Sequence, residues 1–230
     1  MAKDFTLAAY QELLESLMEA DYQIITVEEY FALKEQGPFV VLRHDVDRRP
    51  QNALRMAELE AAMGINSTYY FRKSTFNAGI IRNMSMWGHE IGYHYEVMDK
   101  ARGDIGLAHA IFNAELEILR SWVPVTTCAA HGNPLTKYDN REFFEYFDPG
   151  QFGLVGQAEE IKGYYVTDTG RGNDKYNLKD KPKLWFSVGK ACQYSLHPER
   201  WNDGLGWYRQ WVFDWGCNLT KRCLRARFAH

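Results

Sequence analysis

The stretch FVVLRHDVD, residues 39–47, decides how the chain can fold. Its first four residues are apolar without alternation, which is typical of a short strand covered on both faces, as in a parallel sheet. The strand leads directly into a polar cluster, so chemically active side chains stand at its C-terminal end. Pro50 and the helix formers of residues 53–63 predict that a helix follows, and Gly64 is a natural stop for that helix.

Strand and helix patterns alternate along the rest of the chain. Several predicted strands end in a polar residue: His131, Asp168 and His197 each follow one. Parallel βα units with polar groups just after the strands predict an α/β fold, a (β/α) barrel whose loops gather at one face. The further predicted strands cover residues 22–26, 67–71, 90–95, 126–130, 164–167 and 192–196, and the further predicted helices cover residues 7–20, 27–34, 80–86 and 105–122.

Composition narrows the class of protein. The 230 residues are 46% hydrophobic, which is enough for a large core and favours a single domain over residues 1–230. A formal net charge of -3 offers no basic surface for a nucleic acid or an anionic membrane. The first residues alternate apolar and charged types, so we expect a cytoplasmic protein with no membrane span. The four cysteines are widely spaced, which favours reduced thiols over a disulfide framework.

Asp45 and Asp47 form a pair of carboxylates at the end of a buried strand. In a low-dielectric site they would repel each other unless a cation or hydrogen-bond donors compensated them. The ordinary alternative is that Arg43, Arg48 and Arg49 pair with them at the surface. The pair therefore predicts positive charge nearby without identifying its source.

Histidines and a further carboxylate recur at other strands of the predicted barrel. His89 and His94 accompany a second strand, His131 a third, Asp168 a fourth and His197 a fifth. Imidazole and carboxylate groups of this kind are what a divalent metal ion and an acid/base pair require. The set as a whole favours a divalent metal site with an acid/base pair, although each histidine alone has an ordinary structural explanation.

The order of these motifs resembles the polysaccharide deacetylase family, a carbohydrate-esterase type that includes nodulation-type chitooligosaccharide deacetylases. Residues 42–50, together with the strand at 67–71, are similar to the family's first motif and the strand after it. Residues 88–94, Gly-His-Glu-Ile-Gly-Tyr-His, look like the second motif, which contains the first metal-binding histidine. Residues 195–198, Ser-Leu-His-Pro, are similar to the final Leu-x-His motif. The likeness spans residues 39–201, and the ordered set is more specific than any one motif.

The resemblance implies a fold and roles for individual residues. It implies a distorted seven-stranded TIM-like barrel in which Asp45 is the general base, Asp47 and His94 are metal ligands and His197 is the general acid. His89, the lead-in histidine, is expected to be structural. Segments 130–134 and 165–171 stand where the intermediate motifs lie.

Two residues of the segment 165–171 have a possible part in the chemistry. Asp168 would orient His197 and keep it cationic, and Arg171 would pair with Asp45 and keep it ionised. The alternative for both residues is an ordinary loop ion pair.

The sequence departs from the family at two points. The family's second metal histidine, four residues after the first, is replaced by Met98, a poor ligand for a divalent ion. If the chain stays extended after His94, Glu96 turns to the same side and is a candidate third ligand, and His131 is the other candidate. Val46 separates two aspartates that are adjacent in the family, so we expect a local bulge there.

The resemblance implies a hydrolase that removes the acetyl group from an N-acetylated sugar, and the expected cytoplasmic location favours a substrate in surface polysaccharide biosynthesis. The expected cofactor is a divalent metal, zinc first, with cobalt, nickel or manganese as alternatives, and His131 and Asn133 are also candidates for binding the carbohydrate substrate. One alternative is a metal-dependent hydrolase of another non-peptide C–N bond. The other is a non-catalytic carbohydrate-binding protein that kept the fold after losing the metal.

Overall fold

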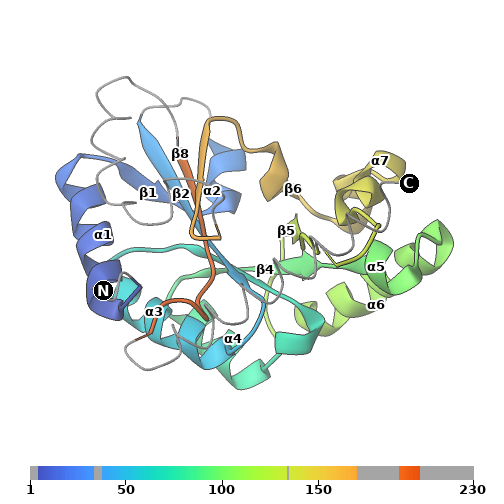
Figure 1. Ribbon diagram of the computed structural model, residues 1–230, viewed down its shortest axis with the longest axis horizontal. Coiled ribbons are helices and arrows are strands. Elements are labelled where there is room, and N and C mark those ends of the chain that lie inside the picture. Colours follow the sequence, from blue (N-terminus) through green and yellow to red (C-terminus); the bar gives the residue numbers. More distant parts are fainter. Residues whose placement is uncertain (1–4, 34–37, 134, 170–191, 203–230) are drawn as a thin grey trace, which may run out of the picture.

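A computed structural model describes residues 5–33, 38–133, 135–169 and 192–202. Seven strands, all parallel to their neighbours, form one sheet in the order β6-β5-β4-β3-β2-β8-β7, and the short β1 pairs with β2. The sheet curls into a half-barrel (Figure 1), which confirms the predicted fold class. The strands are β1 Gln23–Ile25, β2 Phe39–Val46, β3 Thr68–Phe71, β4 Glu90–Tyr95, β5 Thr127–Ala130, β6 Gly156–Gln157, β7 Tyr164–Thr167 and β8 Cys192–Leu196.

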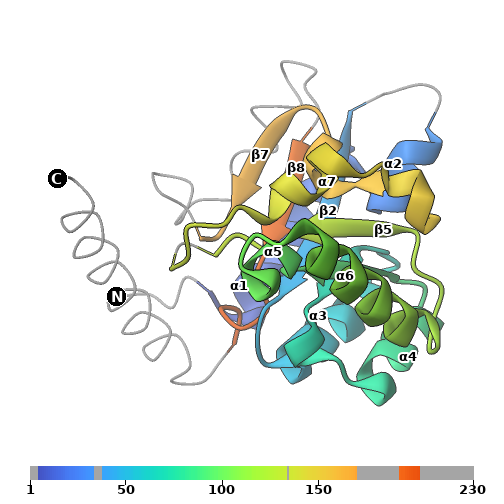
Figure 2. The ribbon, with the colours of Figure 1, turned by 90° about the vertical axis from the view of Figure 1, so that its right-hand side faces the viewer.

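Helices cover the convex face of the sheet. Helices α3, α4 and α6 lie along this face in both ribbon views (Figures 1 and 2), and their apolar side chains pack against β3 and β4 in one large core. None of the helices in the described segments is long and apolar enough to cross a membrane. The helices are α1 Leu7–Glu19, α2 Val27–Ala32, α3 Pro50–Ala62, α4 Ala78–Met86, α5 Val97–Ala101, α6 Ile105–Arg120 and α7 Phe143–Tyr146.

The alternation of side chains along β2 separates the two faces of the sheet. Val40 and Leu42 pack outward in a cluster with α1 and α3, whereas Phe39 and Val41 pack in a cluster with Tyr70 of β3. Because successive side chains in a strand point to opposite faces, Arg43 and Asp45 continue the inner row. His44 continues the outer row and meets α3. The strand thus directs two charged side chains into the half-barrel.

The strand β2 is longer than its apolar run predicts. Its polar residues remain in the sheet because β3 pairs with residues Arg43 to Val46 and β8 with Val40 to His44. At the strand end the Asp47 N–H donates to the Asp45 carbonyl oxygen at 3.0 Å, which forms a tight turn where a bulge was expected. The two aspartates are therefore held by backbone structure. The extent of the domain over residues 1–230 stays a prediction.

A buried carboxylate, Glu60 of α3, joins helices to the sheet behind the inner row. Its side chain is fully buried and accepts hydrogen bonds from the hydroxyl groups of Tyr10 and Ser67. The His44 Nε2 atom lies 2.7 Å from the same carboxylate. His89 stays apart from the inner row: its Nε2–H donates to the Ala57 carbonyl oxygen at 2.9 Å, so its Nδ1 is the acceptor for the Ser67 N–H at 3.3 Å.

We predict that Glu60→Gln lowers the free energy of unfolding by about 3 kcal/mol, because it removes a buried charge while its partners remain buried. Chemical denaturation followed by circular dichroism measures this loss. Glu58→Gln, which changes an exposed residue of the same helix, is the matched control and should stay within about 0.5 kcal/mol of wild type. Equal stabilities of the two variants would contradict the structural role of Glu60.

Candidate active site

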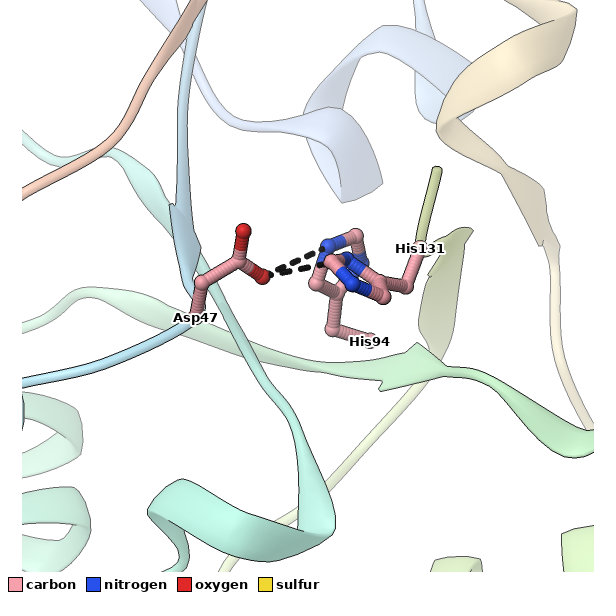
Figure 3. Close-up of side chains that lie close together, drawn as sticks. All are labelled: Asp47, His94 and His131. Atoms are coloured by element: carbon pink, nitrogen blue, oxygen red, sulfur yellow. Dashed lines mark ion pairs between the residues drawn. The ribbon is translucent and has the colours of Figure 1, made fainter. Parts of the chain in front are cut away.

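Three side chains from different strands converge on one point at the C-terminal edge of the sheet. Asp47 follows β2, His94 lies in β4 and His131 follows β5 (Figure 3). The Asp47 Oδ1 atom is 3.4 Å from His94 Nε2 and 3.2 Å from His131 Nδ1. Among the described residues these three form a group whose ligand atoms all lie within 4.8 Å of one another. The carboxyl ends of parallel strands meet at this edge, which explains why residues far apart in sequence come together.

The hydrogen bond of His94 to a backbone carbonyl leaves its other ring nitrogen available to a cation. His94 Nδ1 is 3.0 Å from the Ala129 carbonyl oxygen, so it carries the proton and donates it. In neutral His94 the Nε2 lone pair then faces the lone pairs of Asp47 Oδ1, a buried atom with no hydrogen-bond partner in the described segments. A positive charge between them, either a proton or a metal ion, removes the repulsion. An Asp-His-His set with a backbone partner fixing one imidazole fits a divalent metal such as zinc.

The second carboxylate of the pair, Asp45, is held by one oxygen and open at the other. Its Oδ2 accepts hydrogen bonds from Arg43 Nη2 at 2.9 Å and from the Ser195 hydroxyl at 3.1 Å. Its Oδ1 is buried and has no hydrogen-bond partner among the described residues. Burial opposes the charge, but Arg43, with His94 and His197, holds the pKa of Asp45 at about 2. Asp45 is therefore an ionised group whose Oδ1 has no hydrogen-bond partner in the described part of the chain.

Arg43 is a site residue that the sequence suggested only as a surface partner. It is buried and lies between Asp45 and Glu159, whose Oε1 is 3.6 Å from Arg43 Nη1. Arg43 thus pairs with Asp45 in the described structure, and the predicted pairing of Arg171 with Asp45 stays a prediction because Arg171 lies outside the described residues. The period of two in a strand could have shown that Arg43 shares a face with Asp45.

His197 and Asp168 form a dyad at the ends of β8 and β7. His197 Nδ1 is 2.7 Å from Asp168 Oδ1, and the His197 backbone N–H donates to Asp168 Oδ2 at 2.8 Å. The indole N–H of Trp201 donates to the same oxygen at 2.8 Å. Although burial opposes the charged imidazole, Asp168 raises the pKa of His197 to about 10. Asp168 therefore contacts both the ring and the backbone of His197, and its role in orienting a catalytic histidine stays a prediction.

The structure favours His131 over Glu96 as the third donor. The chain does not stay extended after His94, because β4 ends at Tyr95 and α5 begins at Val97. The Glu96 carboxylate instead pairs with Arg72 and, at 3.2 Å, with Lys100 Nζ. Met98, where the family has a histidine, is buried in the large apolar core.

Two further residues each stand two positions after a site histidine in the sequence, Asn133 after His131 and Glu199 after His197. The Asn133 side-chain oxygen accepts a hydrogen bond from the Leu135 N–H at 3.1 Å, so this amide is engaged in its own loop. Glu199, which the sequence analysis missed, is buried two residues after His197, and its Oε2 has no hydrogen-bond partner among the described residues. Burial raises the pKa of Glu199 to about 7. Its position two residues after a site histidine was the signal available in the sequence.

Comparison with solved structures finds matches in carbohydrate esterase family 4 at low sequence identity. A family 4 carbohydrate esterase from Bacillus anthracis is 10% identical with a TM-score of 0.41, and the match covers 83% of this chain and 77% of that one. A mutant of the peptidoglycan deacetylase PdaC from Bacillus subtilis is 13% identical with a TM-score of 0.42, covering 83% and 96%. A mutant of a family 4 pseudoenzyme from Bacillus anthracis is 14% identical with a TM-score of 0.44, covering 80% of this chain but only 62% of its own length. No protein-family model and no curated protein matches the sequence.

We predict that His131→Ala abolishes retention of zinc, because a site with three protein ligands loses one of them. Elemental analysis after loading and dialysis measures the retained metal. His109→Ala, which removes a histidine of α6 outside the converging group, is the control and should retain as much zinc as wild type. Full zinc content in the His131 variant would contradict the assignment.

We predict that Asp168→Asn lowers the pKa of His197 from about 10 toward the ordinary value of about 6.5, since the carboxylate that stabilises the imidazolium is lost. In wild type the imidazole stays cationic until the pH approaches 10, so the stability that this charge contributes is present below pH 6.5 and lost as the pH rises through 10. NMR titration of the chelator-treated protein follows this ring. An unchanged titration in the variant would show that Asp168 does not set the charge of His197.

Proposed function

We propose that this protein is a metal-dependent hydrolase that removes the acetyl group from an N-acetylated sugar. The observation that carries the proposal is the placement of three kinds of group at one edge of the half-barrel. These are the Asp47, His94 and His131 donor set, the ionised Asp45 with one oxygen unpaired among the described residues, and the cationic His197 held by Asp168. Hydrolysis of an acetamide needs an activated water, stabilisation of the oxyanion and a proton for the leaving nitrogen.

A divalent ion held by Asp47, His94 and His131 would supply the Lewis acidity that activates the water and polarises the acetamide carbonyl. Asp45 supplies the base: its Oδ1 accepts a proton from the water as the oxygen adds to the carbonyl carbon. Arg43 and Ser195 hold Asp45 Oδ2, which restrains the carboxylate and leaves Oδ1 without a hydrogen-bond partner among the described residues. A carboxylate held ionised in this way is ready to act as a base at neutral pH.

His197 supplies the acid in the second half of the reaction. Its Nδ1 is engaged by Asp168, which leaves Nε2 as the nitrogen that gives a proton to the departing amine. When the C–N bond breaks, the products are acetate and an amino sugar. The acid and the base thus come from different strands, and the electrostatics of each favours the protonation state that its task requires.

Asp45→Asn is the decisive variant for this proposal, because it keeps the shape of the side chain and removes the base. We predict that it retains zinc and lowers the rate of acetate release from an N-acetylated sugar by about a hundredfold or more. Enzymatic detection of acetate, with mass spectrometry of the amine product, measures the reaction. Asp21→Asn is the matched control. It makes the same change at an exposed aspartate that is not one of the site residues, and it should leave the rate of acetate release unchanged.

Outcomes of the same assay distinguish the alternative functions. A wild-type protein that holds zinc and hydrolyses only non-sugar amides would support the hydrolase of another C–N bond. A protein that holds no metal but binds sugar would support the carbohydrate-binding alternative, which Met98 first motivated. The cytoplasmic location and the place in surface polysaccharide biosynthesis stay predictions from the sequence.

A further inference from the structure

A second ion-pair system, formed by Arg72 and Glu96, lies beside the Asp-His-His donor set. Arg72 follows β3, and Glu96 stands between β4 and α5. Arg72 Nη2 donates to Glu96 Oε2, and Lys100 Nζ lies 3.2 Å from Glu96 Oε1. Lys100 is held in turn by Glu115, with Nζ 2.8 Å from its Oε1. The Glu96 carboxylate is therefore fixed between two cations, away from the converging donor atoms.

Arg72 also faces the donor set itself. Its Nη1 is 4.0 Å from Asp47 Oδ1, the same oxygen that faces His94 and His131. A guanidinium group carries a permanent positive charge. Arg72 therefore competes with a metal ion for the same oxygen, Asp47 Oδ1. A divalent ion bound at this oxygen would be repelled by the nearby guanidinium, because both are positive in a partly desolvated site.

We propose that Arg72 and Glu96 together set the metal affinity of this site: Arg72 competes with the divalent ion for Asp47, and Glu96 holds Arg72 back. The inference rests on the metal site of the proposed function and concerns its affinity, not its ligands. Glu96 acts as a positioning residue through Arg72.

The two single variants should change metal affinity in opposite directions. In Arg72→Met the competing charge is lost, so the dissociation constant for zinc should fall on the order of tenfold. In Glu96→Gln the tether is lost and Arg72 is free to approach Asp47, so the constant should rise on the order of tenfold. Isothermal titration of the chelator-treated full chain with zinc alone measures both. Lys73→Gln is the control. Lys73 is exposed and follows Arg72 in the sequence, but its ammonium group lies over the Phe76 ring, so this variant should bind zinc as wild type does.

The double variant, Arg72→Met with Glu96→Gln, separates a tether from a ligand. If Glu96 acts through Arg72, the double variant should bind zinc as tightly as Arg72→Met alone, on the order of tenfold more tightly than wild type, because the charge that Glu96 restrains is gone. If Glu96 is itself a ligand, its loss should weaken zinc binding whether or not Arg72 is present, so the double variant should bind clearly more weakly than Arg72→Met alone, which would overturn the proposal. Unchanged affinity in Arg72→Met would also overturn it. Wild-type protein that binds no zinc would reject the metal site itself, whereas wild-type binding with no difference among the variants would reject only the role of Arg72 and Glu96.

Discussion

The central strand β2 carries ionisable side chains on both faces, and each of them needs a partner in the low-dielectric interior of the protein. Outward, His44 meets the buried Glu60 of α3. Inward, Asp45 meets Arg43 of the same strand, and Asp47 at the strand end meets His94 and His131. The outer partner ties a helix to the sheet, whereas the inner partners build the site. A single strand between two parallel neighbours thus links the packing of the fold to its chemistry.

The two inner carboxylates differ because their partners differ. Asp45 receives hydrogen bonds from an arginine and a serine, which stabilise its charge without using its second oxygen. Asp47 meets two imidazoles. In one of them, His94, Nδ1 donates to a backbone carbonyl oxygen, so that in the neutral ring the lone pair is on Nε2, the nitrogen that faces Asp47. The first environment is suited to a base and the second to a metal ligand, so the tight turn between the two residues gives neighbouring positions separate tasks. Arg72 and Glu96 add a further layer of charge around Asp47.

Much of this arrangement was predictable because it depends on local patterns. The unbroken apolar run before Arg43 predicted a parallel strand, and polar residues at successive strand ends predicted that they meet at one edge. The helix after Gln23–Ile25 ends at Ala32, two residues earlier than its pattern predicted, and β2 extends four residues past its apolar run. The second difference has a clear cause, since β3 and β8 provide backbone partners as far as Val46 and His44. Hydrogen bonds to neighbours, which no local pattern records, set the end of the strand.

The sequence by itself determined the α/β fold class and placed Asp45, Asp47, His94, Asp168 and His197 at strand ends, because strand periodicity and motif order are properties of the chain alone. Only the tertiary structure placed His131, and not Glu96, beside Asp47 and His94. That choice depends on β4 ending at Tyr95 and on Arg72, from a different strand, capturing the Glu96 carboxylate. It likewise decided that Arg43 is the partner of Asp45, because the burial of an arginine depends on what the rest of the fold packs around it. Contacts between distant residues set the direction and the charge of a side chain, and these contacts exist only once the sheet has formed.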